Sequence, residues 1–219
     1  MIEAVAPLPL LLLFVVLVGV LFLVLQIRAL SYAYRTIGIS PRYLTAVLVL
    51  TLLGSQVNVP LFITSGGTIV AMNVGGAVIP ILVSLYLFAR TPRRVRMLVA
   101  TAVVAVIAGR LAQIVPGVGI AVPMMIPPLT AAAVALMVSF RRAPSVAYVA
   151  GSMGALIGAD LVNLPHIDHV ATPAVSIGGA GTFDGVFLTG ILAGVLAALI
   201  SPRRDYRTAA EQALDRRAA

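Results

Sequence analysis

The sequence predicts an all-α integral membrane protein, a bundle of about seven transmembrane helices. Three observations predict it. Apolar runs of roughly 20 residues, the length that crosses a hydrocarbon core, follow one another along the chain. Arginines lie in every second connection between these runs, and a few isolated charges fall inside them. A bilayer is the solvent that fits this pattern.

The composition excludes several classes of soluble protein. The 219 residues are 61% hydrophobic and 10% charged, so one soluble core cannot bury the apolar surface. All 15 basic residues are arginines, and they lie in short connections without the interleaved aromatic residues of a nucleic-acid surface. No cysteine is present, which excludes disulfides and thiolate metal sites. We therefore expect the lipid bilayer as the partner, and no nucleic acid.

Seven apolar runs are long enough to be the predicted spans. They lie at residues 7–27, 43–63, 70–89, 97–114, 120–140, 145–164 and 178–200. The first run has the position of a signal peptide, but Glu3 precedes it, Arg28 follows it and no small-residue cleavage site ends it. We therefore expect a retained helix at the N-terminus.

The arginines predict an orientation in the membrane. The connections after the first, third, fifth and seventh runs carry Arg28, Arg35, Arg42, Arg90, Arg93, Arg94, Arg96, Arg141, Arg142, Arg203, Arg204 and Arg207, and the other connections carry none. Because arginine is enriched on the cytoplasmic side, we expect the N-terminus outside the cell and the C-terminus in the cytoplasm. The membrane would be the cell (inner or plasma) membrane. Residues 1–204 then form a single multi-pass transmembrane domain, and residues 205–219 form a short cytoplasmic C-terminal tail.

Two stretches of the chain are similar to each other. Residues 53–60 align with 157–165, and residues 73–77 align with 176–180, so that helices 2-3 resemble helices 6-7. The copies would run in the same direction, which predicts a parallel internal repeat with a pseudo-axis along the membrane normal. Chance similarity is the alternative. Glycine, asparagine and proline recur at the outer ends of these helices, which are therefore either broken there or closely packed through glycine.

Three ionisable residues lie within the predicted spans. Asp160 and Asp184 fall about 6 and 9 Å below the outer surface at a rise of ~1.5 Å per residue, and Arg110 falls at a similar depth. Charges at this depth are costly, so Asp160 and Asp184 are candidate catalytic residues and Arg110 is a candidate substrate- or ion-binding residue. An arginine–aspartate pair that only joins helices is the alternative. Because one arginine cannot neutralise two carboxylates, the expected cofactor is a proton or a cation.

Three asparagines near the predicted outer surface are further candidates for substrate or ion binding. Asn58, Asn73 and Asn163 either hydrogen-bond a ligand or cap broken helices, and capping is the simpler role. No nucleotide is expected, because the chain has no lysine to supply a Walker loop.

The outer loop between the sixth and seventh runs contains candidate metal ligands. His166, Asp168 and His169 lie within four residues of sequence. Imidazole and carboxylate groups in such proximity can bind a divalent ion or take up protons. Exposed loops also carry such residues without a function, which is the alternative.

Two motifs carry a resemblance to a known family. Residues 158–161 (Gly-Ala-Asp-Leu) and 178–188 (Gly-Gly-Ala-Gly-Thr-Phe-Asp-Gly-Val-Phe-Leu) resemble a family of polytopic bacterial and archaeal membrane proteins of unknown function, over nearly all of the chain. That resemblance implies a topology and no activity. The placement of Asp160 and Asp184 on adjacent helices is also distantly similar to presenilin-type intramembrane aspartyl proteases. The residues before Asp184 read Gly-Thr-Phe, however, and depart from the Gly-x-Gly-Asp motif of those enzymes.

These observations leave three functional hypotheses. The first is a transporter of a small solute or ion with a proton- or cation-coupled carboxylate site in the outer leaflet. The second is an intramembrane hydrolase in which Asp160 and Asp184 share one proton, which contact with Arg110 would prevent. The third is a membrane assembly subunit without catalysis. A homo-oligomer is compatible with all three, and no residue marks an interface.

Overall fold

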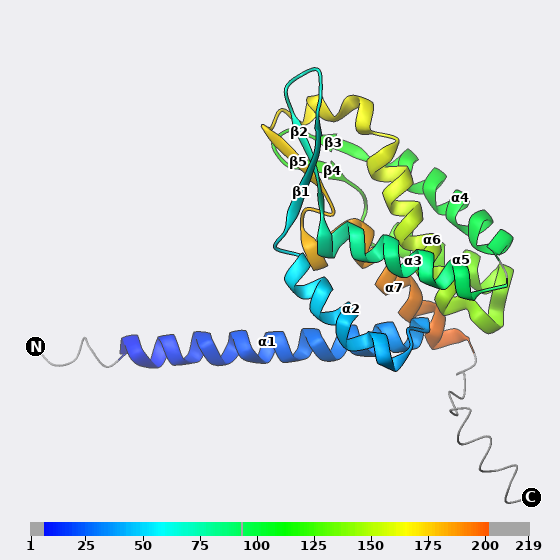
Figure 1. The fold of residues 1–219 in the computed structure, drawn as a ribbon, viewed down its shortest axis with the longest axis horizontal. Helices are drawn as coiled ribbons and strands as arrows, with labels where there is room; N and C mark the ends of the chain where they lie inside the picture. The colour runs from blue at the N-terminus through cyan, green and yellow to red at the C-terminus, as the bar shows by residue number, and fades with distance from the viewer. Residues whose placement is uncertain (1–6, 93, 202–219) are drawn as a thin grey trace, which may run out of the picture.

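The computed structural model describes residues 7–92 and 94–201, and it is mostly helical (Figure 1). Seven α-helices lie in these residues: α1 (Pro7–Ile37), α2 (Pro41–Gly54), α3 (Ile79–Arg90), α4 (Arg94–Leu111), α5 (Ile126–Ser139), α6 (Ala143–Ala155) and α7 (Gly185–Ile200). Five short strands accompany them: β1 (Asn58–Ile63), β2 (Ile69–Asn73), β3 (Gln113–Val115), β4 (Gly119–Ala121) and β5 (Ala174–Ile177). The predicted number of helices is confirmed, and the strands are what the all-α prediction missed. The predicted tail, 205–219, lies outside the described residues.

Helix length distinguishes α1 from the other helices. Leu11–Ile37 is long and apolar enough to cross a bilayer, and Ile126–Leu161 with Leu164–Val170, bent by 65°, would make a second span. A helix of 14 residues such as α2 reaches only about 21 Å, against a hydrocarbon core of about 30 Å. By length and composition, the described residues therefore contain one or two candidate spans rather than seven.

A β-hairpin replaces the outer half of the second predicted span. Helix α2 ends at Gly54, and β1 then pairs antiparallel with β2. The turn between them contains Gly67, whose φ of +88° suits glycine. β-Branched and aromatic residues flank this turn, and Pro60 would disrupt the interior of a helix. The local sequence therefore favours strands over the helix predicted for 43–63.

Strand β5 joins this hairpin from the other half of the chain. The order is β1-β2-β5, and β5 runs parallel to β2 with Ile69 opposite Ala174. Next to this pairing the similar segments 73–77 and 176–180 are in contact, because an added Cβ at Gly76 would overlap the Gly178 carbonyl oxygen, and β2 and β5 lie side by side (Figure 1). A second hairpin, β3–β4, connects α4 to α5 and turns at Gly117, with a φ of +76°. We call this part of the molecule, with its strands and hairpins, the sheet end.

The opposite part of the bundle, which we call the arginine end, contains the α1–α2, α3–α4 and α5–α6 connections and the end of α7. Two hydrogen bonds hold it together: Ser145 Oγ on α6 donates to the Ile37 carbonyl (2.6 Å), and Arg96 Nη1 on α4 donates to the Val138 carbonyl (2.9 Å). In or beside these connections lie Arg35, Arg42, Arg90, Arg94, Arg96, Arg141 and Arg142. The acidic residues of the described segments, Asp160, Asp168 and Asp184, belong to the sheet end. The charges are thus separated along the bundle.

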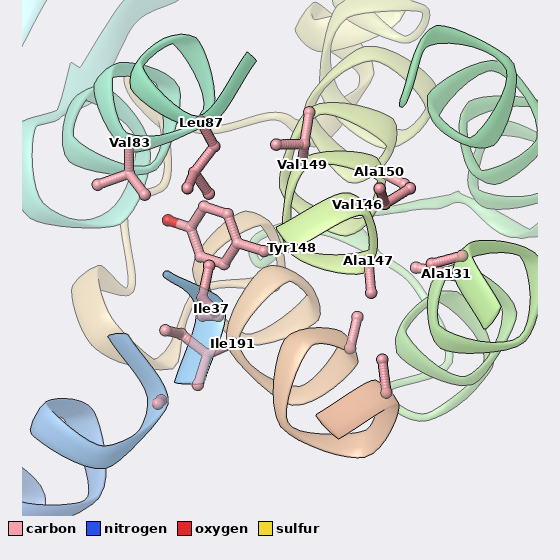
Figure 2. Close-up of a cluster of buried hydrophobic side chains, with 14 of the residues drawn as sticks. Ile37, Val83, Leu87, Ala131, Val146, Ala147, Tyr148, Val149, Ala150 and Ile191 are labelled. Atoms are coloured by element: carbon pink, nitrogen blue, oxygen red, sulfur yellow. The ribbon is translucent and has the colours of Figure 1, made fainter. Parts of the chain in front are cut away.

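The main hydrophobic core surrounds Tyr148 of α6 (Figure 2). Ile37 of α1, Leu87 of α3 and Ile191 of α7 surround this ring, so four helices meet there. Helices α6 and α7 approach closely because Gly151 faces α7 without a side chain, where an added Cβ would lie 2.8 Å from a backbone oxygen. In contrast, the apolar side chains of 11–25 on α1 are exposed, and this part of α1 projects away from the bundle (Figure 1).

Candidate functional site

The candidate site at the sheet end is formed by Asp160 and Asp184, each near the end of a helix. Asp160 lies in a π-helical segment, Leu156–Leu161, that continues α6. Asp184 lies directly before α7. Single π-helical turns inside α-helices often occur at functional sites, since they re-aim one side chain. Both carboxylates are half-buried.

Gly158 determines how closely the π-helical segment approaches α4. A Cβ at this position would overlap the carbonyl oxygen of Ala105 and would lie 2.9 Å from the Ala105 Cα. Gly109 faces Gly158 from α4, so glycine lies on both sides of the contact. This close packing positions Asp160, which follows Gly158 by two residues. Among the described residues, no hydrogen bond or ion pair engages the Asp160 carboxylate.

Asp184 has a structural role as well as a place in the site. Its Oδ1 accepts a hydrogen bond from the Val186 N–H (2.8 Å), which caps the first turn of α7. The sequence around it explains the position of the cap. Gly178 and Gly181 adopt positive φ angles of +73° and +60°, so the chain turns out of β5 and into α7 within a few residues. The turn and the cap therefore fix the backbone that positions the Asp184 carboxylate in the site.

Two cavities meet at these carboxylates. The first has a volume of about 480 Å³ and is bounded by the β3–β4 turn, by β5 and by the backbone of 178–180. The second has a volume of about 290 Å³ and lies among α5, α6 and α7, with Pro127 and Thr189 in its wall. Asp160 and Asp184 line both cavities. No described lysine, arginine or histidine lines either of them.

Arg110 does not join the aspartates. It lies in the last turn of α4, its side chain is exposed, and it lines neither cavity. Within the part of the chain that the structure describes, no ion pair connects it to a carboxylate. The expected convergence of three charges is therefore wrong for Arg110. Its side chain is exposed at the end of α4 and does not reach the cavities of Asp160 and Asp184.

The candidate asparagines mainly complete the backbone. The buried Asn73 donates to the Ser55 carbonyl (2.9 Å) and accepts from the Gly76 N–H (2.8 Å), which caps the π-helix Val74–Val78 that precedes α3. Asn163 donates to the Ala159 carbonyl one turn earlier (2.8 Å). The capping role is therefore seen for Asn73, whereas Asn163 makes no N-cap bond and binds a carbonyl of the preceding helical turn.

Asn58 connects the two similar stretches of the chain. Its Oδ1 accepts from Asn73 Nδ2 (3.1 Å) and from Ser176 Oγ on β5 (2.6 Å). Asn58 and Ser176 come from β1 and β5, which lie on either side of β2. Their hydrogen bond therefore links the sheet across its central strand, and Ser176 also lines the first cavity.

The candidate metal ligands are not assembled into a metal site. No group of three or more histidine, aspartate or glutamate residues that could hold a metal ion occurs in residues 7–92 and 94–201. The rings of His166 and His169 lie 6.0 Å apart, on the 3₁₀-helix Leu164–Val170. Asp168 instead binds the turn of the β1–β2 hairpin, where it accepts from Thr64 Oγ1 and from the Gly66 N–H (3.2 Å). These hydrogen bonds hold the pKa of Asp168 below its usual range, and the bond from Thr64 has the largest effect.

The sequence interpretation missed several groups that line the cavities. The backbone of Gly178, Gly179 and Ala180 borders the first cavity, and Thr189 borders the second. The repeated Gly-Gly-Ala motif contained the signal for the first group, but it was assigned to broken helices or to close helix packing. The β3–β4 hairpin that covers the aspartates had the weaker signal of two glycines in five residues, at 117 and 119.

The fold and site define a class: a mostly helical protein with an apolar N-terminal helix long enough to cross a bilayer and two half-buried carboxylates in a shared cavity. The chain belongs to the family described as Protein of unknown function (DUF1614), whose model matches residues 36–196. The match contains both aspartates and excludes most of α1. No curated protein and no solved structure matched the chain, so the distant likeness to presenilin-type proteases gains no support.

Proposed function

We propose that this protein is a multi-pass membrane transporter of a small solute or ion, coupled to a proton or a cation at Asp160 and Asp184. The observation that carries the proposal is the position of the two carboxylates where two cavities meet. A transporter needs a binding site that can be reached from two directions, and it often uses broken helices to build that site. Asp160 lies just before the bend that follows Leu161, and Asp184 lies at the start of α7.

The charge of the site favours a proton or a cation as the coupled species. Two half-buried carboxylates face common cavities without a described basic side chain beside them. A buried negative charge without a positive partner is costly, and a second carboxylate nearby raises that cost. Uptake of a proton or a small cation removes the cost. Arg110 lines neither cavity and therefore does not neutralise the carboxylates in place of a proton or cation.

The membrane setting is supported by the surface of the molecule. Large apolar side chains are exposed on several helices besides α1, including Leu50 on α2, Leu82 on α3 and Val106 on α4. Lipid would cover such a surface, whereas water would not. The arginine end then faces the cytoplasm and the sheet end faces outward, with the N-terminus outside and the C-terminus inside. The short helices cross this membrane together with the segments that continue them.

The parallel repeat is part of the same proposal. In each copy a helix is followed by strand structure and then by a Gly-Gly-Ala segment before the next helix, at 75–77 in the first copy and 178–180 in the second. Transporters built from parallel repeats place the substrate at the interface between the copies. The first cavity adjoins β5, which is the strand of the second copy, and includes Val70 of β2, the strand of the first.

Proton flux into vesicles tests the proposal. The purified chain is reconstituted into liposomes that contain a pH-sensitive dye, and a potassium diffusion potential is imposed, with sodium or choline as the other cation. We expect flux, or flux that depends on one cation, in the wild type and at least a tenfold loss in Asp160→Asn and Asp184→Asn. Asparagine preserves the α7 cap, so Asp184→Asn removes the charge without removing the helix start.

Arg110→Gln is the matched control, because it removes a charge at the sheet end outside the cavities. It should transport as the wild type does. Equal flux in the wild type, both aspartate variants and protein-free liposomes would show that the coupling role is wrong. That result, with the fold intact, would leave the assembly-subunit hypothesis.

A hydrolase is the second candidate, because two aspartates without a basic neighbour suit a shared proton. Incubation with helical peptide substrates, with and without an aspartyl-protease transition-state analogue, distinguishes it from a transporter. Cleavage that Asp160→Asn and Asp184→Asn both abolish would replace the transport proposal. Because two cavities meet at the aspartates, we favour passage of a solute over hydrolysis and expect no cleavage.

A further inference from the structure

A separate groove lies between α2 and α3, close to the arginine end. Its volume is about 410 Å³, within the range of small-molecule sites, and its walls are almost entirely apolar. Ala46 and Leu50 come from α2, and Leu82 and Val83 come from α3. Leu50 and Leu82 are exposed whereas Val83 is buried, so the groove is open along its length and closed at its floor.

Tyr43, Tyr86 and Arg90 line the polar end of this groove, and Arg42 lies beside it, stacked on Tyr43. The rings of Tyr43 and Tyr86 meet edge to face, with centroids 5.9 Å apart. The Arg42 guanidinium lies over the Tyr43 ring at 4.9 Å, and the Arg90 guanidinium lies over the Tyr86 ring at 5.4 Å. Stacking on a ring holds each guanidinium in place and leaves its N–H edges free for an anion.

The positive charge beside the groove has no acidic partner nearby among the described residues, which favours an anionic ligand. Arg42 and Arg90 are both exposed, and the acidic residues among 7–92 and 94–201 all belong to the sheet end. An apolar groove with cations at one end matches an amphiphile with an anionic head. Basic pockets between helices on the cytoplasmic side are typical sites for acidic phospholipids.

We propose that this groove binds one anionic phospholipid, with an acyl chain between α2 and α3 and the phosphate between Arg42 and Arg90. The inference requires the membrane setting of the proposed function and is independent of the aspartates. Tyr43 and Tyr86 lie at headgroup depth in this arrangement, as aromatic residues do at membrane interfaces.

Lipid binding to the full chain, measured by native mass spectrometry from detergent, tests the site. The probes are phosphatidylglycerol and phosphatidylcholine with identical acyl chains. We expect one phosphatidylglycerol to bind more tightly than phosphatidylcholine, and Arg42→Gln and Arg90→Gln each to weaken phosphatidylglycerol binding about fivefold. Arg141→Gln is the matched control, because Arg141 is exposed at the same end and outside the groove. It should leave binding unchanged.

A second variant tests the acyl-chain part of the site. Ala46→Phe fills the groove from an exposed wall position and keeps both arginines, so binding of both lipids at this site should fall. Equal affinity for the two lipids, an equal effect of Arg141→Gln and Arg90→Gln, or wild-type binding by Ala46→Phe would each overturn the proposal. Proton flux should be unchanged in Arg90→Gln, which keeps a failure of this site distinct from a failure of the carboxylate site.

Discussion

Replacing Gly158 by alanine tests whether close packing of the π-helical segment on α4 positions the aspartate site. The new Cβ would overlap the Ala105 carbonyl oxygen, whereas ordinary contact begins at 3.4 Å. The two segments must therefore separate by roughly 1 Å in a tightly packed region. Overpacking of this kind costs about 1–3 kcal/mol, and the higher helix propensity of alanine returns up to about 1 kcal/mol. We expect a net loss of about 1–2 kcal/mol.

Thermal unfolding in detergent measures this loss. For a domain of this size, about 1–2 kcal/mol corresponds to a fall in Tm of roughly 2–8 °C. Gly19→Ala is the matched control, because an added Cβ at Gly19 meets nothing within 4 Å, and its Tm should be unchanged or slightly higher. Displacement of Asp160 should also reduce proton flux in Gly158→Ala but not in Gly19→Ala. Equal Tm and flux in the two variants would refute the packing argument.

Three further predictions concern single hydrogen bonds. Asp184→Ala removes the α7 cap and should lower stability by about 1 kcal/mol in thermal unfolding, whereas Asp184→Asn should not; equal losses would contradict the capping role. The pKa of Asp168 is lowered by folding, so its contribution to stability is present above about pH 4 and is lost as the pH falls through the lowered pKa. The Tm difference between wild type and Asp168→Asn should therefore shrink between pH 6 and pH 2.5, and a constant difference would contradict it. Tyr34→Phe removes a buried bond to Thr51 (3.1 Å) and should cost about 1 kcal/mol by the same assay, whereas Tyr32→Phe, at an exposed position, should cost nothing.

Apolar runs located the helices in the sequence but not their ends. The run at 43–63 became a 14-residue helix and a strand, because apolarity alone does not distinguish a helix from a buried or lipid-facing strand. The local signals were present in Pro60 and in the Gly66-Gly67 turn. They were assigned to broken helix because a membrane setting makes helix the default. Strand β5 had no comparable signal, since its pairing partner lies about a hundred residues earlier.

For the site as well, the sequence predicted which residues are charged within apolar runs but not which of them lie together in three dimensions. Charges inside apolar runs identified Asp160 and Asp184, which the structure brings to common cavities. The same rule selected Arg110, which faces away, because depth along a helix says nothing about the direction of a side chain. His166 and Asp168 were grouped by sequence proximity, whereas Asp168 binds Thr64, over a hundred residues away. Such a pairing can be found only from coordinates.

The parallel pairing of β2 with β5 has a consequence for how the chain is made. During synthesis β2 emerges long before β5, so its outer edge has no partner until residues 174–177 leave the ribosome. An unpaired edge can join another chain, and a nascent hairpin in this state is a target for chaperones or for misassembly. A chain interrupted between α6 and β5 should therefore aggregate or be degraded, even though six of its seven helices have been completed.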